Sequence, residues 1–475
     1  MNNSTGQSTL QLIIPLLVIL LFTLSFAYFM PVMSTVKTLA VAGGIILFMV
    51  SFVSSQAALY ILIFSMLLGP EIVVGETGGA SLGRGITLRL DDFILIIIGF
   101  GWLARMAIHK ELGLFLKTPL NKPIAFYILA CLISTLIGAL MGRLDLKTGF
   151  FFVLKYFQYV IIYFMVVNYV QEKKEISRFL WALLITCVLV SVFGITQIPG
   201  GGRVSAPFEG EMGEPNTFGG YLLFMMAIAM GLFLTTNARR DRIIYGGIAA
   251  FAFFPFLFTQ SRASYLAFFP ILLAFVWLSE KRKLIIICLV FFGALLTIIA
   301  PQKVKDRIAY TFNQTPQAGQ VQIGDVRLDT STSARLRSWH DALQATARHP
   351  IIGFGITGYK LVDAQYIRVL VETGIIGMLS FILLMGAIFR QGNIVFRETR
   401  DAFHRGLSMG FLAGFIGLLA HAVGANTFII VRIMEPFWFV LAMVIMIPEV
   451  EAKGHSDEGL QGSFEASQNG QELKQ

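Results

Sequence analysis

The chain has 475 residues, of which 56% are hydrophobic and 14% charged, with a mean hydropathy of +0.73 and a net charge of +9. Soluble globular chains carry about 25% charged residues, so this composition is not that of a soluble domain. Long apolar runs recur throughout, whereas membrane β-barrels show short alternating strands. The sequence therefore predicts an all-α polytopic membrane protein.

Apolar runs of about 17–25 residues, each long enough to cross a bilayer, predict about 12–14 transmembrane helices. The first run is long for a cleaved signal and no basic residue precedes it, so we expect a retained span. Val32–Gly69 fits either two short helices or one span with a re-entrant piece. The runs lie at residues 9–30, 35–52, 56–69, 92–108, 123–141, 149–170, 177–196, 216–236, 243–259, 263–279, 284–300, 365–389, 405–425 and 428–448.

The positive charge gathers in short loops between these runs, a bias that marks cytoplasmic loops. We therefore expect no nucleic acid partner and place both termini in the cytoplasm. The four clusters are Lys173/Lys174/Arg178, Arg239/Arg240/Arg242, Lys281/Arg282/Lys283 and Arg390/Arg397/Arg400/Arg405.

This topology divides the chain into five parts. One of them is the only long polar stretch inside the hydrophobic chain, and it is expected on the non-cytoplasmic side. The tail is polar and is expected to be disordered. The parts are the N-terminal transmembrane helices (1–176), the central transmembrane helices (177–300), the long loop (301–364), the C-terminal transmembrane helices (365–448) and the cytoplasmic tail (449–475).

The sequence offers no metal or cofactor site. Cys131, Cys187 and Cys288 all fall inside predicted spans, so no disulfide framework or thiolate site is indicated. The six histidines lack zinc-ligand spacing. We expect neither a metal nor a cofactor.

Two short non-cytoplasmic segments carry arginines. Arg203 is the only cation in a glycine-rich connector that continues to Glu214 and Asn216, and its planar fork suits phosphate. Asn216 is either part of a site or only the N-cap of the next span. Arg262 lies in a tight turn between two apolar spans. It binds a ligand there or extends its side chain to the lipid headgroups.

The long loop is predicted to contain an amphipathic helix that begins at a cap among Ser331, Thr332 and Ser333. Proline ends this helix, because the residue before proline is pushed out of the helical conformation. The helix either presents arginines above the bundle or binds anionic headgroups. Its expected apolar stripe is Leu336, Trp339, Leu343 and Ala347, with Arg337 and Arg348 sharing a face, Arg335 projecting elsewhere, and His349-Pro350 at the end.

A glycine-rich turn, Gly353-x-Gly355-x-x-Gly358, follows the helix. No βαβ unit surrounds it, so it is not a dinucleotide fingerprint, and we expect a flexible turn that lets the backbone approach a ligand. Asp363 is a cap of the next span or a base that deprotonates an acceptor hydroxyl. Glu372 lies inside that span and is a functional candidate for this reason. Arg432 and Glu435 are expected to neutralise each other as a structural pair.

Several arginines thus converge on one membrane face with few acidic residues. The ligand that suits them is a membrane-embedded polyanion, most simply a lipid diphosphate. No DxD-type metal motif faces that side, so the arginines would stabilise the leaving diphosphate themselves.

At these residues, over roughly Leu180–Ala425, the chain resembles the O-antigen ligase/polymerase superfamily of bacterial envelope glycosyltransferases. The order and spacing of the motifs carry the resemblance, although no single motif is specific. The motifs are Arg203…Phe208…Glu214-Pro215-Asn216, Thr259-Gln-Ser-Arg262, Arg335-x-x-x-Trp339…His349-Pro-x-x-Gly353-x-Gly355 and Asp363…Leu370-x-Glu372-x-Gly374-x-x-Gly377.

The resemblance implies a GT-C-like, metal-independent inverting glycosyltransferase of the bacterial inner membrane with a periplasmic active site. An undecaprenyl-diphosphate-linked oligosaccharide would be the donor, and its diphosphate would be held by Arg203, Arg262 and Arg335 or Arg337. The family's ligases carry a His-Asn pair late in the long loop, where this chain has Asp363-Ala364. This difference favours members of exopolysaccharide or polymerase systems over ligation to lipid A core.

The sequence is compatible with two classes of function. A polymerase or ligase would use a glycan acceptor and work with the flippase and chain-length regulator of its pathway. A lipid-linked glycan transporter would instead place ionisable residues at mid-membrane on broken helices. Because the long loop supplies only some of the arginines, we expect it to be a mobile lid over a site completed by Arg203 and Arg262.

Overall fold

The structure is a computed structural model of the chain. It describes residues 34–73, 87–108, 117–209, 213–283, 320–323 and 326–472, together with isolated residues between 285 and 314.

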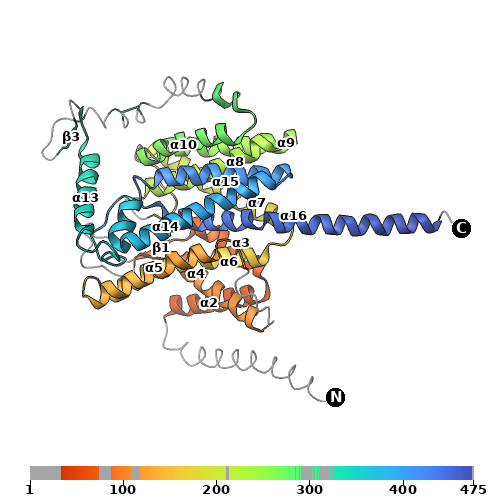
Figure 1. Ribbon diagram of the computed structural model, residues 1–475, viewed down its shortest axis with the longest axis horizontal. Coiled ribbons are helices and arrows are strands. Elements are labelled where there is room, and N and C mark those ends of the chain that lie inside the picture. Colours follow the sequence, from red (N-terminus) through yellow and green to blue (C-terminus); the bar gives the residue numbers. More distant parts are fainter. Residues whose placement is uncertain are drawn as a thin grey trace, which may run out of the picture.

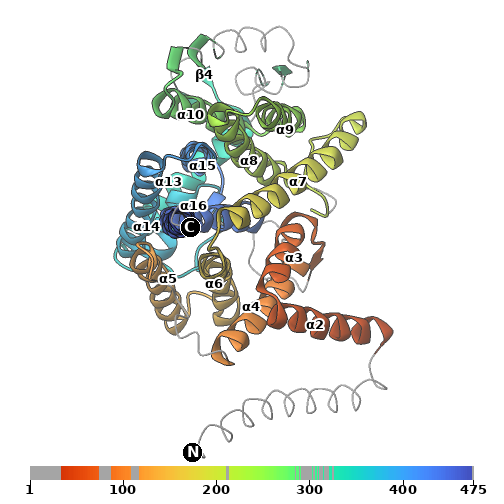
Figure 2. The same cartoon turned by 90° about the vertical axis from the view of Figure 1, so that its right-hand side faces the viewer.

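Most described residues belong to helices of one bundle (Figures 1 and 2). Nine of the described helices are long and apolar enough to span a membrane, and the apolar α3 and α10 are shorter. The helices are α2 (Thr35–Val53), α3 (Ser55–Leu68), α4 (Leu90–Ile108), α5 (Asn121–Leu140), α6 (Leu146–Tyr169), α7 (Lys173–Gln197), α8 (Pro215–Thr235), α9 (Arg239–Phe258), α10 (Arg262–Leu278), α13 (Thr330–Thr346), α14 (Gln365–Glu398), α15 (Ala402–His421) and α16 (Val431–Glu472).

These helices confirm the prediction of an all-α polytopic membrane protein, since twelve predicted spans coincide with α2–α10 and α14–α16. The predicted span 9–30 lies outside the described residues, and 284–300 lies largely outside them. Val32–Gly69 forms two helices, α2 and α3. They separate at Ser54, whose hydroxyl accepts a hydrogen bond from the Ala57 amide at 3.2 Å and caps α3.

The described part of the long loop from residue 326 to 364 and the short arginine-bearing turns lie at one end of the bundle (Figure 1), which we call the loop end. Helix α13 lies across this end, roughly perpendicular to the spans (Figure 1). Two short antiparallel hairpins accompany it: β1 (Glu71–Val73) with β2 (Thr87–Arg89), and β3 (Gln322–Ile323) with β4 (Val326–Arg327). The loop end therefore gathers segments that are far apart in the sequence.

The predicted basic loops gather at the opposite end. Lys173 pairs there with Asp401, and Arg405 pairs with Glu280 at 2.8 Å. The Lys281 ammonium also donates to the Leu234 carbonyl at 3.3 Å. These contacts join the loops after α6, α8, α10 and α14, as the charge pattern predicted for loops that share one face.

The centre of the bundle is formed by α8, α15 and α16 (Figure 2). Small residues let α8 and α15 approach closely, as is common between membrane helices. A Cβ atom on Gly231 would lie 2.4 Å from the Gly406 carbonyl oxygen and 2.5 Å from the Gly410 nitrogen. The two helices therefore meet backbone to backbone and hold the loop-end residues that they carry in fixed positions.

The C-terminal segment differs from its prediction. The polar composition from Glu449 onward predicted a disordered tail, whereas α16 continues as a helix to Glu472. The helix projects beyond the bundle at the end opposite α13 (Figure 1).

Candidate functional site

The connector after α7 and the corner between α9 and α10 are joined by the Arg203 side chain. Its Nε donates to the Thr259 carbonyl at 3.0 Å, and the Val204 amide donates to the Phe258 carbonyl at 3.0 Å. Gln260 adopts a left-handed backbone conformation (φ 49°), which makes the corner tight. Arg203 and Arg262, which are 59 positions apart, are thus held on neighbouring strands of loop.

Asn216 is not the cap that one interpretation assigned to it. The N-cap of α8 is Glu214, with Pro215 as the first helical residue. The side-chain Oδ1 of Asn216 instead accepts a hydrogen bond from Nη2 of Arg203 at 3.3 Å. Glu214 accepts from the Thr217 hydroxyl at 2.8 Å. Asn216 therefore helps to orient an exposed arginine.

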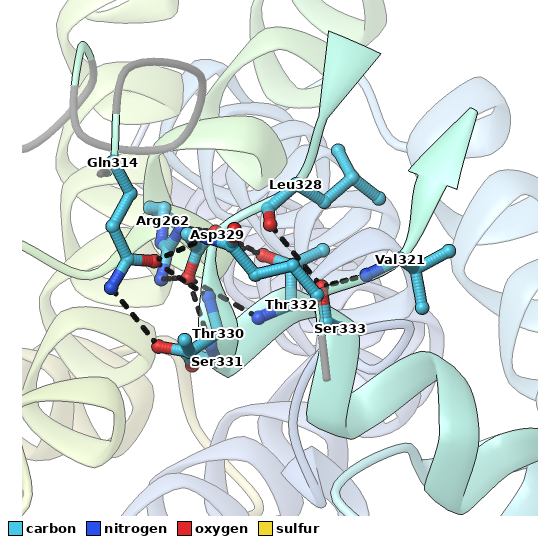
Figure 3. Close-up of polar contacts among 10 residues, drawn as sticks. Arg262, Gln314, Val321, Leu328, Asp329, Thr330, Ser331, Thr332 and Ser333 are labelled. Atoms are coloured by element: carbon cyan, nitrogen blue, oxygen red, sulfur yellow. Dashed lines mark hydrogen bonds and ion pairs between the residues drawn. The ribbon is translucent and has the colours of Figure 1, made fainter. Parts of the chain in front are cut away.

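Arg262 forms a bidentate ion pair with Asp329, the residue that caps α13 (Figure 3). Its Nη1 lies 2.6 Å from Oδ2 of Asp329, and its Nη2 lies 3.1 Å from Oδ1. The same carboxylate accepts from the backbone amides of Ser331 and Thr332 at 3.0 and 3.3 Å. The N-cap is therefore Asp329, not one of the predicted residues Ser331, Thr332 and Ser333.

The Asp329 carboxylate is fully buried. Burial raises the pKa of this carboxyl, but the hydrogen bonds from Arg262 and Thr332 outweigh that effect and lower the pKa to about 2. Asp329 is therefore ionised at neutral pH, and the contact joins two full charges.

The arginines of α13 lie on different sides of the helix. A helix turns about 100° per residue, so Arg335 shares a side with Thr332, which Arg262 contacts at 3.4 Å. Arg335 is half-buried, and no acidic side chain among the described residues pairs with it. Arg337 is exposed on the other side. The exposure pattern thus places Arg335, but not Arg337, on the bundle side of the helix, the side that also carries Thr332.

The C-terminal half of α13 rests on a small apolar cluster, which we call the α13 cluster: Ala342, Ala345, Val362, Ala364 and Val371, with Trp339 against it. The predicted apolar stripe is wrong in part, because Leu343 and Ala347 are exposed. Trp339 does face inward. The inward face of this half carries the small side chains of Ala342 and Ala345, and these let α13 lie close to α14.

Asp363 is exposed between two members of the α13 cluster, Val362 and Ala364. It is not the cap of α14, because Ala364 is the N-cap residue and no side chain bonds there. Asp363 thus lies beside the C-terminal half of α13, whereas Arg262 lies at the N-terminal end.

The glycine-rich turn approaches the backbone of α14. Helix α14 is kinked at Gly374 (φ 66°, ψ −166°), and the turn supplies hydrogen bonds on both sides of the kink. The amides of Phe354 and Gly355 donate to the Val371 and Glu372 carbonyls at 3.0 and 2.8 Å. The amide of Ile375 donates to the Pro350 carbonyl at 2.8 Å. This clasp anchors the C-terminal end of the long loop in the bundle.

Glu372 is buried and paired with Arg368, four residues earlier on α14, at 3.1 Å. The same oxygen, Oε1, accepts from the Thr357 amide at 3.2 Å, so Glu372 also holds the glycine-rich turn. The sequence interpretation overlooked Arg368, although i,i+4 spacing is readable from the sequence. Glu372 is neutralised within the protein in this arrangement.

Arg432 does not pair with Glu435 as predicted. It is fully buried and donates to the carbonyls of Leu67, Gly69, Pro207 and Phe208, with Glu209 at 3.8 Å. The Glu435 carboxylate, also fully buried, has no hydrogen-bond partner among the described residues. Arg432 therefore ties the end of α3 and the Arg203 connector to the start of α16.

Further buried acidic residues were missed by the sequence interpretation. Asp91 and Asp92 begin α4, and the Asp92 carboxylate accepts from the Gln158 amide at 3.0 Å and from the Arg89 backbone at 2.8 Å. In the part of the chain that the structure describes, no group of histidine, cysteine or acidic side chains could hold a metal ion.

The fold and this site define a class: an all-α polytopic membrane protein with arginines gathered under a helix that lies across one end of the bundle. Residues 247–382 are similar to the family model described as O-antigen ligase. The resemblance found in the sequence is confirmed over this segment, whereas the Arg203 motif lies outside it. The matched segment contains Arg262, Arg335, Asp363 and Glu372. No curated protein matches the chain.

Proposed function

We propose that the protein is a membrane glycosyltransferase that transfers or polymerises glycan repeat units from an undecaprenyl-diphosphate-linked donor, at the periplasmic face, in exopolysaccharide or O-antigen assembly. The observation that carries this proposal is the gathering of Arg203, Arg262 and Arg335 at the loop end. Arginine forks bind phosphate oxygens in two-pronged contacts, and several of them can replace a metal ion at a diphosphate.

The order of side chains along α13 suits such a donor. Arg262 and Arg335 would hold the diphosphate near the N-terminal half, and Trp339 and Asp363 lie toward the C-terminal half, where the sugars would extend. In an inverting transfer, an acceptor hydroxyl oxygen attacks the anomeric carbon. The bond from that carbon to the diphosphate oxygen breaks, and undecaprenyl diphosphate leaves with the electron pair.

Asp363 is the expected base, but its neighbours Val362 and Ala364 pack at Ala342. Ala342 lies ten residues, or about 15 Å, along α13 from Thr332, which Arg262 contacts. The hydroxyl proton would therefore pass to solvent, and Asp363 would contact the glycan.

Glu372 is a weaker candidate for contact with the substrate than Asp363, because Arg368 and the Thr357 amide already occupy its carboxylate. We propose that it supports the site by holding the glycine-rich turn on α14. Polymerisation is favoured over ligation to lipid A core by Asp363-Ala364, which stand where the family's ligases carry His-Asn.

A lipid-linked glycan transporter is the second candidate, and the buried ionisable residues favour it. Arg368, Glu372, Asp91, Asp92, Arg432 and Glu435 all lie inside the bundle. However, each lies near the start of its helix. Glu435 is about 6 Å and Glu372 about 10 Å along the axis from the first helical residue, by the rise of 1.5 Å per residue. These residues therefore lie nearer to the loop end than to mid-membrane, which favours a glycosyltransferase site at the membrane face over a transporter site.

The test compares Arg335→Ala with Arg337→Ala, since both remove an arginine from α13 but only Arg335 faces the bundle. Purified protein in lipid nanodiscs would receive a lipid-linked donor, and the products would be lengthened glycan and released lipid diphosphate. Loss of one charge-assisted contact of about 1.5–3 kcal/mol should lower the kcat/KM of Arg335→Ala by about 10- to 100-fold. Arg337→Ala should stay near the wild-type value.

Equal activity of both variants would remove Arg335 from the site, and full activity after alanine substitution at Arg203, Arg262 and Arg335 in turn would contradict the diphosphate mechanism. Movement of the donor across the membrane without glycan extension would identify a transporter. Immunoblots of the membrane fraction control for expression.

A further inference from the structure

The Asp329 carboxylate fills the guanidinium fork that a donor phosphate would need. We propose that Asp329 is a specificity-determining residue: it is an internal competitor for the anion site at Arg262, and a prenyl diphosphate binds there only by displacing it and releasing the N-terminal end of α13. This inference rests on the proposed function, since it concerns the same arginine.

The contact geometry supports competition. Both terminal nitrogens of Arg262 are used by Asp329, at 2.6 and 3.1 Å. A carboxylate and a phosphate present paired oxygens of similar geometry to an arginine fork, so the two cannot occupy these nitrogens together. Arg262 itself remains partly accessible, with 16% of its side chain exposed, whereas Asp329 is covered completely. An anion can therefore reach the arginine from outside.

The charges explain why the site would select a diphosphate. Asp329 stays ionised, so Arg262 is already neutralised by one negative charge. A singly charged anion would bring Arg262 the same charge as Asp329. Unlike Asp329, which is already part of the protein, it would also lose translational and rotational entropy on binding. A diphosphate carries more charge and could also extend toward Arg335, which lies one turn beyond Thr332 on the same side of α13. Its interaction energy with the two arginines can therefore exceed that of the Arg262–Asp329 pair.

The two ends of α13 are attached differently. The N-terminal end contacts the bundle through Arg262, which pairs with Asp329 (Figure 3). Its other contacts are with the segment before the helix: the Gln314 amide oxygen accepts from the Thr330 amide at 2.8 Å, and the Val321 amide donates to the Ser333 hydroxyl at 2.9 Å. The C-terminal end is held by the α13 cluster and by the clasp in the kink of α14. Displacement of Asp329 therefore frees one end of the helix while the other remains anchored.

The experiment measures binding of farnesyl diphosphate, with farnesyl monophosphate as the weaker anion, to the full chain in zwitterionic nanodiscs. Asp329→Asn keeps a good N-cap but removes the competing charge. We expect it to bind the diphosphate about tenfold more tightly, which corresponds to about 1.4 kcal/mol. In an Arg262→Ala background, the same substitution should give no gain, because the competition is then absent.

Hydrogen exchange provides the second readout. Amides of residues 330–335 should exchange faster when farnesyl diphosphate binds the wild type, and faster without ligand in Asp329→Asn. Asp341→Asn is the matched control, because it removes an ion pair with Lys360 (2.8 Å) from the exposed side of the same helix. It should change neither affinity nor exchange at 330–335.

Three results would overturn the proposal: unchanged affinity in Asp329→Asn, an equal gain in the Arg262→Ala background, or equal enhancement of exchange by the monophosphate. The first of these, combined with loss of glycan transfer in Arg262→Ala, would leave the proposed function standing. Conversely, a gain that depends on Arg262, in a protein that extends no glycan, would support the internal competitor and contradict the glycosyltransferase. Vesicles that contain phosphatidylglycerol test whether lipid headgroups are the anion that displaces Asp329. Faster exchange at residues 330–335 with these vesicles, but not with farnesyl diphosphate, would exclude the diphosphate as the ligand.

Discussion

At the scale of single residues, the arginines of the loop end differ in what already occupies them. Arg203 is exposed and oriented by the Thr259 carbonyl and the Asn216 side chain. Arg262 is neutralised by Asp329, and Arg432 is enclosed by backbone carbonyls. The sequence presents them as similar cations, but in the structure Arg203 is exposed, Arg262 is in an internal ion pair and Arg432 is buried among backbone carbonyls.

The lowered pKa of Asp329 gives a prediction about pH. The pKa of Asp329 is about 2 in the folded protein, against an ordinary value of 3.8. Its contribution of about 2 kcal/mol to folding stability is therefore complete above pH 3.8 and is lost as the pH falls toward the folded-state pKa. Exchange at residues 330–335 should therefore be constant, after correction for the intrinsic rate, from about pH 8 to about pH 5. If exchange at these residues instead rises between pH 8 and pH 5, the Arg262–Asp329 ion pair does not hold the N-terminal end of α13.

At the scale of elements, α14 depends on its kink. Gly374 has a positive φ, and a Cβ atom there would lie 2.4 Å from the carbonyl carbon and oxygen of Ile351. The glycine-rich turn could then no longer dock against the helix. The kink therefore fixes both the path of α14 and the anchored end of the long loop.

We expect Gly374→Ala to lower the free energy of unfolding by more than about 2 kcal/mol, because it adds backbone strain and separates the clasp. Gly386→Ala is the matched control on the same helix, since nothing lies within 4 Å of a Cβ atom at that position. It should be neutral or stabilising by up to about 1 kcal/mol from helix propensity. Thermal unfolding in detergent compares the two variants, and equal melting temperatures would contradict the role given to the kink.

At the scale of the whole molecule, Arg432 connects three segments of the chain. Its guanidinium bonds to the end of α3 and to the Arg203 connector from a helix more than 200 positions away. A buried guanidinium needs protein acceptors, and here backbone carbonyls accept from its two terminal nitrogens, whereas Nε has no hydrogen-bond partner among the described residues. The loop end is therefore assembled around a buried cation.

Substitution of Arg432 by Met should destabilise the protein by about 3–5 kcal/mol, since it leaves several carbonyls and Glu209 without their partner. The control is Arg405→Met at the opposite end, where an exposed pair with Glu280 should contribute less than about 1 kcal/mol. The yield of monodisperse protein and its melting temperature measure both. Similar losses in the two variants would show that Arg432 has no special place in the assembly.

The sequence by itself determined the membrane class, the bounds of most spans to within a few residues and the common end of the basic loops. These features depend on local hydropathy and local charge, which act strongly on each segment independently of the others. Glu372 with Arg368, and Asp329 ahead of a run of serine and threonine, were also readable from local spacing. Only the tertiary structure decided that Asp329 meets Arg262 across 67 positions, that Arg432 binds carbonyls and not Glu435, and that Arg335 faces the bundle while Arg337 does not. The physical reason is that a charge chooses its partner by distance in space, and the loops that set those distances carry no periodic signal.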